Sequence, residues 1–334
     1  MSLEIAKTAG EGLGKTLLHC VPPRTESWVL KRGIEKILLT TRYEYPPDFW
    51  ETIEGYASNS GFVIVQNHTS NADILAGDLL ANRITQRVNR VVPEEKKMGG
   101  FIEPFALSLP EKGQGEMSKF YSEVLPLINR LRVETNPTPT LNDILNGRIK
   151  TYEQFVNSHK ESTRRMREAA KKKRKGIVLP AEATVQGGRI NPETERIYGM
   201  QVFTPGAINQ ALRMVTKENE HGILIPVGVS AGYKVLNSET NEITLPATMV
   251  GLGASKQAIM TVHVGNPIIY RKGDVRNLDS ADLDYDIGTT IAQMLEPHER
   301  GVYSNREAFD VAIAEYKKKQ DKAEAIIEAL RSAA

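Results

Sequence analysis

Four short stretches of the chain are apolar at nearly every position. Continuous apolar runs of this length are typical of β-strands that are covered on both faces, as in a parallel sheet. They lie at residues 61–66 (GFVIVQ), 176–182 (GIVLPAE), 222–230 (GILIPVGVS) and 258–268 (AIMTVHVGNPI). The segments around them are helical in pattern, at residues 72–83, 151–175, 204–219 and 280–296. This alternation predicts an α/β fold in which a mostly parallel central sheet is covered by helices.

The two ends of the chain differ from this alternating part. The N-terminal residues are mainly helical in pattern, with a break at the sequence YPPDF (45–49), and a charged helix closes the chain at 306–331. The sequence ETNPTPTLN (134–142) predicts a long surface loop. We therefore expect a mainly helical N-terminal segment, an α/β domain and a C-terminal helix, at residues 1–60, 61–305 and 306–334.

Composition and charge narrow the class of protein. The 334 residues include 43 basic and 41 acidic ones, so the net charge of +2 gives no reason to expect nucleic acid as a partner. A single cysteine, Cys20, excludes an internal disulfide framework and fits a reducing compartment. No stretch approaches the roughly 18 to 20 apolar residues of a membrane span, and the N-terminus lacks the apolar part of a secretory signal. The sequence thus predicts a soluble protein that is still able to touch a membrane surface.

Basic residues are concentrated at the end of one predicted helix, in the run RRMREAAKKKRK (164–175). The favoured interpretation is a solvated helix end whose cations interact well with the helix dipole. The alternative is attraction to an anionic lipid surface or to an acidic carrier protein, worth about 1 kcal/mol per basic residue near a charged membrane. Peripheral contact with an anionic membrane is therefore a secondary expectation.

Candidate chemistry begins where the first apolar run ends. The sequence VIVQNHTSNADIL (63–75) passes from apolar residues into a polar cluster that contains His68 and Asp73. Taken alone, this cluster is explained as turn and N-cap residues before a helix. Loops after the carboxyl ends of parallel strands are, however, where α/β proteins build their sites. A carboxylate that holds one imidazole nitrogen leaves the other to act as a general base, so the pair is a candidate catalytic site.

Several stretches resemble the sequence blocks of the glycerolipid acyltransferases, the family of glycerol-3-phosphate and lysophosphatidate acyltransferases. NHTSNAD resembles their N-H-x-x-x-x-D block, which implies that His68 and Asp73 are catalytic. LPAEATVQGGR is similar to the family's P-E-G-T-R block, with Glu182 and Thr184 in matching places. Three further stretches, ILIPVGV, VHVGNPI and EPHERGVY, follow in the family's order. The resemblance therefore covers about residues 60–305.

The chain departs from the family pattern where the phosphate of the acceptor is bound. Val185 stands in the place of the family's phosphate-binding arginine. The sequence GGR that follows is similar to the G-G-R of soluble plastid-type glycerol-3-phosphate acyltransferases, which makes Gly187, Gly188 and Arg189 the expected substitutes. Two glycines let the backbone approach an anion closely, and an arginine offers a forked donor for phosphate oxygens.

Further binding residues follow from the same resemblance. The family has a basic residue where this chain has Pro104, and Arg130 or Arg132 are the substitutes that the sequence offers. Glu182 ends an apolar strand, and its expected role is to bind the acceptor's hydroxyl or to orient the neighbouring arginine. A metal site is not expected, because the remaining histidines have no metal-ligand spacing: His19, His159, His221, His263 and His298.

The resemblance implies that the protein transfers a fatty acyl group from an acyl thioester to glycerol-3-phosphate. His68 would take the hydroxyl proton as the oxygen attacks the thioester carbonyl, and Asp73 would hold the imidazole. Backbone N–H groups around 68–73 or 183–188 would stabilise the negative charge that develops on the carbonyl oxygen. No cofactor is expected, since acyl-CoA or acyl-carrier-protein serves as co-substrate. The expected location is the cytoplasm, or the plastid stroma in a eukaryote.

Two alternatives stay open. The same fold could act on lysophosphatidate or on another hydroxyl or amine, which the missing arginine at Val185 allows. From a different class, the protein could be a non-catalytic lipid- or protein-binding module, or a hydrolase that passes the acyl group to water. Acceptor-independent cleavage of the thioester would support the hydrolase.

Overall fold

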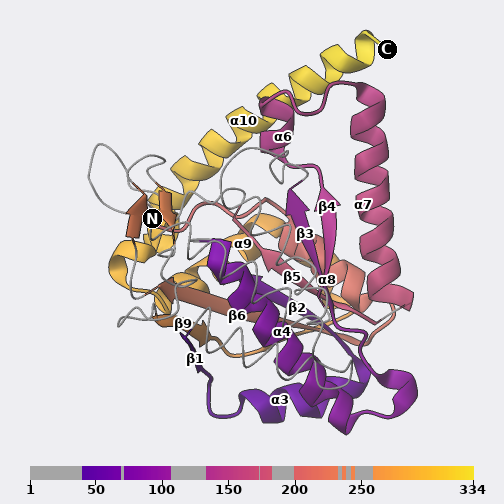
Figure 1. Cartoon of the computed structure of the whole chain (residues 1–334), viewed down its shortest axis with the longest axis vertical. Helices are drawn as coiled ribbons and strands as arrows, with labels where there is room; N and C mark the ends of the chain where they lie inside the picture. Colours follow the sequence, from indigo (N-terminus) through magenta and orange to yellow (C-terminus); the bar gives the residue numbers. More distant parts are fainter. Residues whose placement is uncertain are drawn as a thin grey trace, which may run out of the picture.

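Helices and strands alternate through the part of the chain that the computed structural model describes, residues 40–68, 71–106, 133–172, 174–182, 199–231, 235–237, 242–244 and 259–334 (Figure 1). The helices there are α3 (Phe49–Tyr56), α4 (Asn71–Val91), α6 (Leu141–Leu145), α7 (Tyr152–Lys172), α8 (Ala207–Thr216), α9 (Ser280–Gln293) and α10 (Arg306–Ser332). The strands are β1 (Thr40–Glu44), β2 (Ser60–Gln66), β3 (Phe101–Ala106), β4 (Val133–Thr138), β5 (Gly176–Pro180), β6 (His221–Ala231), β7 (Val235–Asn237), β8 (Glu242–Thr244), β9 (Ile259–Val264) and β10 (Ile268–Arg271).

Eight of the described strands form one mixed sheet, in the order β1-β9-β6-β2-β5-β3-β4, with β10 beside β6. The strands from β6 to β4 are parallel to one another. In contrast, β9 and β10 pair antiparallel with β6, and β1 lies parallel to β9. A separate ladder joins β7 and β8. The sheet is therefore mostly parallel and flanked by helices, which confirms the predicted α/β class.

Helices cover both faces of the sheet, which explains why its central strands are apolar at successive positions. In β2, Phe62 and Ile64 belong to the core beneath α3 and α4, whereas Val63 and Val65 belong to the core beneath α7, α8 and α9. All four side chains are fully buried. In Figure 1, α4 crosses in front of the sheet and α8 lies behind it. At about 1.5 to 3 kcal/mol per buried large apolar side chain, this double cover anchors the strand that leads into the predicted site.

The C-terminal helix is held at two places along its length. Near its start, Phe309 is buried and its ring lies 5.4 Å from that of Tyr303. Two-thirds of the way along, Ala323 is buried against Ile144 and Ile149, beside α6 and α7. Between these contacts α10 runs along the outside of the molecule, toward the C-terminus at the top of Figure 1.

The predicted surface loop at 134–142 is wrong, because β4 occupies most of it. β4 lies at the edge of the sheet and pairs only with β3 in the described chain. An edge strand tolerates Pro137, which has no N–H to donate. Asn136 is fully buried, and its Nδ2 donates to the backbone oxygen of Ser162 in α7 at 3.1 Å. Tertiary contacts with β3 and α7 thus stabilise a strand that the local composition disfavours.

Two further strands differ from the prediction. In the N-terminal segment expected to be mainly helical, β1 inserts into the sheet beside β9, although α3 is helical as expected. The run predicted as one strand at 258–268 is two strands, because residues 265–267 (GNP) interrupt it. Residues 1–39 lie outside the described part, so the rest of that segment and the three-part division of the chain stay predictions. Within the described ranges, no helix has the length and apolar character needed to cross a membrane.

Candidate active site

The carboxyl ends of three adjacent parallel strands meet at one edge of the sheet. Gln66, the last residue of β2, lies opposite Pro180 of β5 and Val227 of β6. His68 follows β2 after one intervening residue, and Glu182 follows β5 in the same way. Two of the residues singled out in the sequence are therefore brought together, although 114 positions separate them.

The carboxylate of Glu182 joins the two loops. The backbone N–H of His68 donates to Glu182 Oε1 at 3.0 Å, and the backbone N–H of Gln201 donates to Oε2 at 2.9 Å. His68 is 8% exposed and Glu182 is 5% exposed. Hydrogen bonds to a charged acceptor are stronger in such an environment than in water. Glu182 therefore fixes the backbone of His68 relative to β5 and to the segment around Gln201.

Asn67 holds the same loop from the other side. Its Nδ2 donates to the backbone oxygen of Val229 at 3.0 Å, and the backbone N–H of Val229 donates to its Oδ1 at 2.7 Å. The Asn67 side chain is fully buried. This pair of bonds continues the β2–β6 ladder with a side chain in place of a backbone. The residue next to His68 is thus locked to β6.

A C-terminal segment braces these loops. The backbone N–H of Phe203 donates to the hydroxyl of Tyr303 at 3.0 Å, and the hydroxyl of Ser230 donates to Glu299 Oε2 at 2.8 Å. Burial is the main cause that raises the pKa of Tyr303 well above its ordinary value, and nearby carboxylates add to it. The Tyr303 hydroxyl therefore keeps its proton and stays an uncharged acceptor for the Phe203 N–H.

Helix α9 packs closely beneath this segment. Asp284 is 2% exposed, and its Oδ2 accepts the backbone N–H of Gly206 at 2.9 Å, at the start of α8. Burial raises the pKa of Asp284 to about 7, the Gly206 bond opposes this, and the carboxylate of Asp279 adds to it. A Cβ on Gly288 would lie 2.0 Å from the ring of Tyr303, so only glycine permits this approach.

A second buried carboxyl group lies between α4 and the sheet. Asp78 of α4 and Glu103 of β3 are both fully buried and lie close to each other. Burial is the main cause that raises the pKa of Asp78 well above its ordinary value, and the nearby Glu103 side chain opposes this rise. Desolvation disfavours the charged form of a buried carboxyl group. Burial therefore favours the protonated form of Asp78 in α4, the helix that follows His68.

The other predicted site residues lie at the limits of the described chain or outside it. Asp73 is in the first turn of α4, and its side chain is outside the described part. The remaining predicted binding residues are also outside it, namely Thr184, Gly187, Gly188, Arg189 and Arg132, with Arg130 and Val185. The role expected for Glu182, toward the acceptor or an arginine, stays a prediction. Its contacts add another role, which is to position His68.

Sequence reasoning missed three residues that hold the site. Asn67 was interpreted as a turn residue, although it directly precedes the histidine in the N-H-x-x-x-x-D resemblance. Tyr303 lies in the EPHERGVY stretch and was noted only as part of a match. Gln201 contributes a backbone N–H, which no sequence pattern could have indicated. Among the described residues, no group of three or more His, Cys, Asp or Glu could hold a metal ion.

Part of the basic run at the end of α7 is paired with acidic residues of the same chain. Glu134 pairs with two of these cations: its Oε1 lies 3.5 Å from Arg165 Nη2, and its Oε2 lies 2.6 Å from Lys175 Nζ. Lys171 Nζ lies 3.4 Å from Glu218 Oε1. These pairs favour a helix end with internal ion pairs over a free cationic surface.

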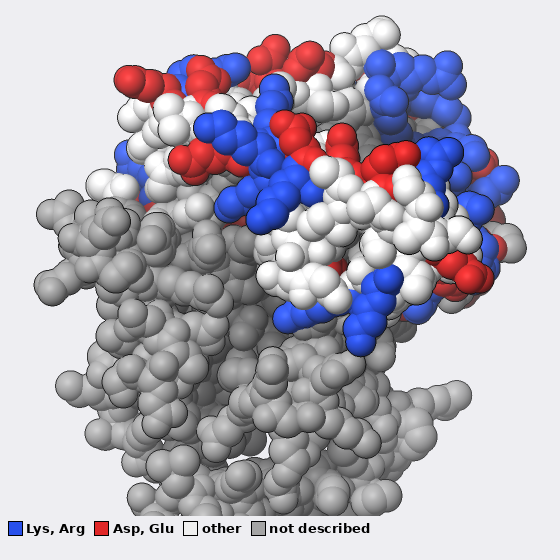
Figure 2. Space-filling view, turned by 90° about the horizontal axis from the view of Figure 1, so that it is seen from above, with Lys and Arg blue, Asp and Glu red and all other residues white. Residues whose placement is uncertain are grey.

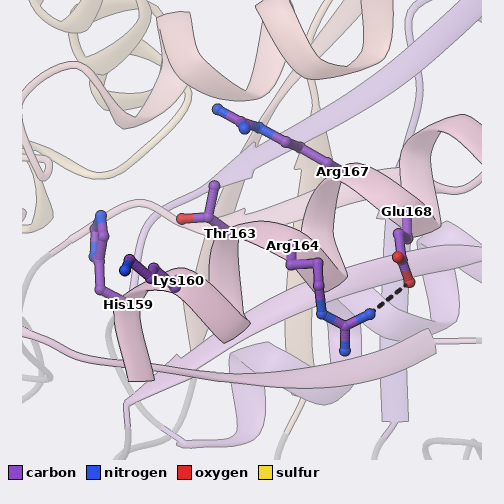
Figure 3. Close-up of a pocket in the computed structure, with 6 residues that line it drawn as sticks. All are labelled: His159, Lys160, Thr163, Arg164, Arg167 and Glu168. Atoms are coloured by element: carbon purple, nitrogen blue, oxygen red, sulfur yellow. Dashed lines mark hydrogen bonds and ion pairs between the residues drawn. The ribbon is translucent and has the colours of Figure 1, made fainter. Parts of the chain in front are cut away.

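A shallow pocket of about 360 Å³ lies along α7 (Figure 3). It is lined by His159, Lys160, Thr163, Arg164, Arg167 and Glu168. Figure 3 shows Arg164 turned toward Glu168, and Arg164 is also bound by Glu161 at 2.7 Å. None of these residues belongs to the site predicted from the sequence.

No protein-family model matches the chain, and no curated protein matches it significantly in sequence. The likeness to the glycerolipid acyltransferases therefore depends on the motif residues themselves and on their arrangement.

Proposed function

We propose that this protein is an acyltransferase that moves a fatty acyl group from an acyl thioester to the hydroxyl of glycerol-3-phosphate. The observation that carries the proposal is the fixed position of His68 at the carboxyl end of β2, where Glu182 and Asn67 hold its loop from two sides. A general base must be held at a constant distance from the proton that it abstracts, and a misplacement of about 1 Å can cost about 100-fold in rate. The resemblance of NHTSNAD to the acyltransferase block supplies the reaction.

In this reaction, the imidazole of His68 takes the proton of the acceptor hydroxyl while the oxygen attacks the thioester carbonyl carbon. A C–O bond forms, the C–S bond breaks, and the proton on His68 passes to the leaving thiolate. Asp73, from the first turn of α4, stabilises the imidazolium. Backbone N–H groups near His68 are the proposed donors to the carbonyl oxygen, where negative charge develops. No covalent acyl-enzyme is needed.

The deciding experiment measures thiol release from an acyl thioester with and without glycerol-3-phosphate. Release that requires the acceptor and yields an acylated glycerol phosphate supports the proposal. The variant His68→Ala should lose about 10² to 10⁴ in kcat, because it lacks the general base. His159→Ala is the matched control, since that histidine lies exposed on α7 and should keep wild-type activity. A folded His68→Ala protein with near wild-type kcat would exclude His68 as the base.

The proposed phosphate contact is tested through Arg189. A charge-assisted hydrogen bond contributes roughly 1.5 to 3 kcal/mol, so Arg189→Ala should lower kcat/KM for glycerol-3-phosphate about 10- to 150-fold. KM for the acyl donor should stay unchanged, and Arg189→Lys should recover only part of the loss. If kcat/KM for unphosphorylated glycerol falls equally, Arg189 has a structural role and does not bind the phosphate. Arg130 or Arg132 would then be the candidate for the phosphate contact.

The alternatives are separated by the same assay. Transfer rates to a panel of acceptors that includes lysophosphatidate show whether the protein prefers glycerol-3-phosphate or another acceptor. Thiol release at an equal rate without any acceptor would indicate a hydrolase. Acyl-lipid binding without thiol release by the folded protein would indicate a binding module.

A further inference from the structure

Helix α10 carries an exposed cluster of lysines, Lys317, Lys318, Lys319 and Lys322, called here the α10 lysine cluster. Within the described chain, none of the four has an ion pair or a side-chain hydrogen bond. The cations at the end of α7 differ in part, since Arg165, Lys171 and Lys175 are paired with acidic residues. We infer that the α10 lysine cluster is the docking surface for an acidic carrier protein that delivers the acyl thioester. This inference rests on the proposed acyl transfer.

A chain of contacts leads from the α10 lysine cluster to the candidate active site. Tyr316, directly before the cluster, is half-buried and its hydroxyl lies close to the side chain of Thr204. The backbone N–H of Thr204 donates to the oxygen of Ala181 at 2.9 Å, and Ala181 precedes Glu182, which binds the backbone of His68. Three successive contacts thus connect the helix turn that carries the lysines to the proposed general base.

The helix that carries the cluster is anchored on both sides of it, and its lysines face solvent. Phe309 and Ala323 are buried on either side of the cluster, so this part of α10 is anchored at both ends. Along a helix of 1.5 Å rise, the four lysines cover about 7.5 Å. Figure 2, which looks down on the molecule of Figure 1 from above, shows lysine and arginine side chains interspersed with acidic ones on that face. A preformed surface of this kind needs little reordering when a partner binds.

The arrangement of the lysines favours a protein over a single phosphate group. Consecutive helix residues point about 100° apart, so Lys317 and Lys319 lie on opposite flanks of α10, while Lys318 and Lys322, one turn apart, share the face between them. Diverging cations suit an extended acidic surface, which they attract over a Debye length of about 8 Å at physiological salt.

A membrane surface fits the α10 lysine cluster less well. A helix that lies in a membrane surface needs an apolar face beside its basic one. The large apolar residues of α10 that follow the cluster, Ile326, Ile327 and Leu330, instead pack against the core formed with α6 and α7. The acidic carrier is therefore the occupant that the described contacts favour.

The test compares two charge reversals of equal size. Lys318→Glu/Lys319→Glu alters the α10 lysine cluster, and Lys160→Glu/Arg167→Glu on α7 is the matched control, because those two cations are also exposed and have no ion pair in the described chain. The probes are a hexadecanoyl-loaded bacterial acyl carrier protein, hexadecanoyl-CoA and vesicles that contain anionic phosphatidylglycerol. Binding of the carrier is measured by fluorescence anisotropy, and transfer is measured by thiol release.

Carrier binding by the α10 variant should weaken about tenfold, since each reversed lysine replaces an attraction by a repulsion. KM for the loaded carrier should rise by the same factor, with kcat and KM for hexadecanoyl-CoA unchanged, and the α7 control should match the wild type. The inference would be overturned if the α10 variant lost activity equally with the loaded carrier and with hexadecanoyl-CoA. It would also be overturned if carrier binding stayed unchanged, or if the variant lost vesicle binding alone. If the wild type transfers no acyl group from either donor, the proposed function fails, whereas the anisotropy measurement still decides whether the cluster binds the carrier.

Discussion

Replacing Asp284 by asparagine should change the pH dependence of stability in a defined direction. Asp284 lies 2% exposed in α9, with one oxygen bonded to the Gly206 N–H and the other, Oδ1, buried without a hydrogen bond in the described chain. Burial raises its pKa from 3.8 to about 7. A carboxyl whose pKa is raised on folding binds its proton more tightly in the folded state. Stability is therefore highest below the unfolded pKa and is lost as pH rises through about 7.

The magnitude follows from proton linkage. Each unit of pKa difference corresponds to about 1.4 kcal/mol, so the free energy of unfolding of the wild type should fall by about that much per pH unit between the two pKa values. Asparagine keeps the shape and the acceptor for Gly206 but does not titrate. Relative to Asp284→Asn, the wild type should therefore lose roughly 2 to 3 kcal/mol between pH 5 and pH 8.

The measurement is urea unfolding of both proteins at a series of pH values, followed by the fluorescence of the two tryptophans. The other titrating groups are common to both proteins, so they cancel when the free energy of unfolding of the variant is subtracted from that of the wild type. The quantity to compare with the prediction is the slope of this difference against pH. Asp286→Asn, an exposed carboxylate on the same helix, controls for the loss of a charge as such. Parallel stability curves for wild type and Asp284→Asn between pH 5 and pH 8 would refute the reasoning.

Three other changes have expected outcomes. Asn67→Ala leaves a buried backbone N–H and C=O of β6 unpaired. The free energy of unfolding should therefore fall by about 2 to 4 kcal/mol, and kcat should fall with it. A loss below about 1 kcal/mol in urea unfolding would contradict this. Asp78→Asn should gain stability relative to the wild type as pH rises, because burial raises the pKa of Asp78 and the wild type loses the stability of its protonated form through that pKa, whereas asparagine does not titrate. Urea unfolding of both proteins at a series of pH values checks this, and a difference in the free energy of unfolding that stays constant with pH would contradict it. Gly288→Ala places a methyl group against the ring of Tyr303. The variant should therefore be less stable by about 1 to 3 kcal/mol. A thermal midpoint equal to that of the wild type would show that the ring can move aside.

The sequence determined the class of the fold and the position of His68. Continuous apolar runs identified β2, β5 and β6 because a strand that is buried on both faces needs apolar side chains at every position. The end of such a run is visible in the sequence itself, and the polar residues after β2 therefore placed His68 at the carboxyl edge of a parallel sheet. Both signals depend only on residues that are close together in the sequence.

Only the tertiary structure decided what holds His68 and which cations are neutralised. Glu182 and His68 are 114 positions apart, and Asn67 and Val229 are 162 apart, so no local pattern indicates that they pair. β4 forms despite Pro137 because it lies at the edge of the sheet beside β3. Arg165, Lys171 and Lys175 of the basic run on α7 pair with Glu134 and Glu218, while the lysines of the α10 lysine cluster have no ion pair in the described chain. The physical reason is common to all of these cases: contact energies depend on which distant segments become neighbours, and strand order fixes that only after the chain has folded.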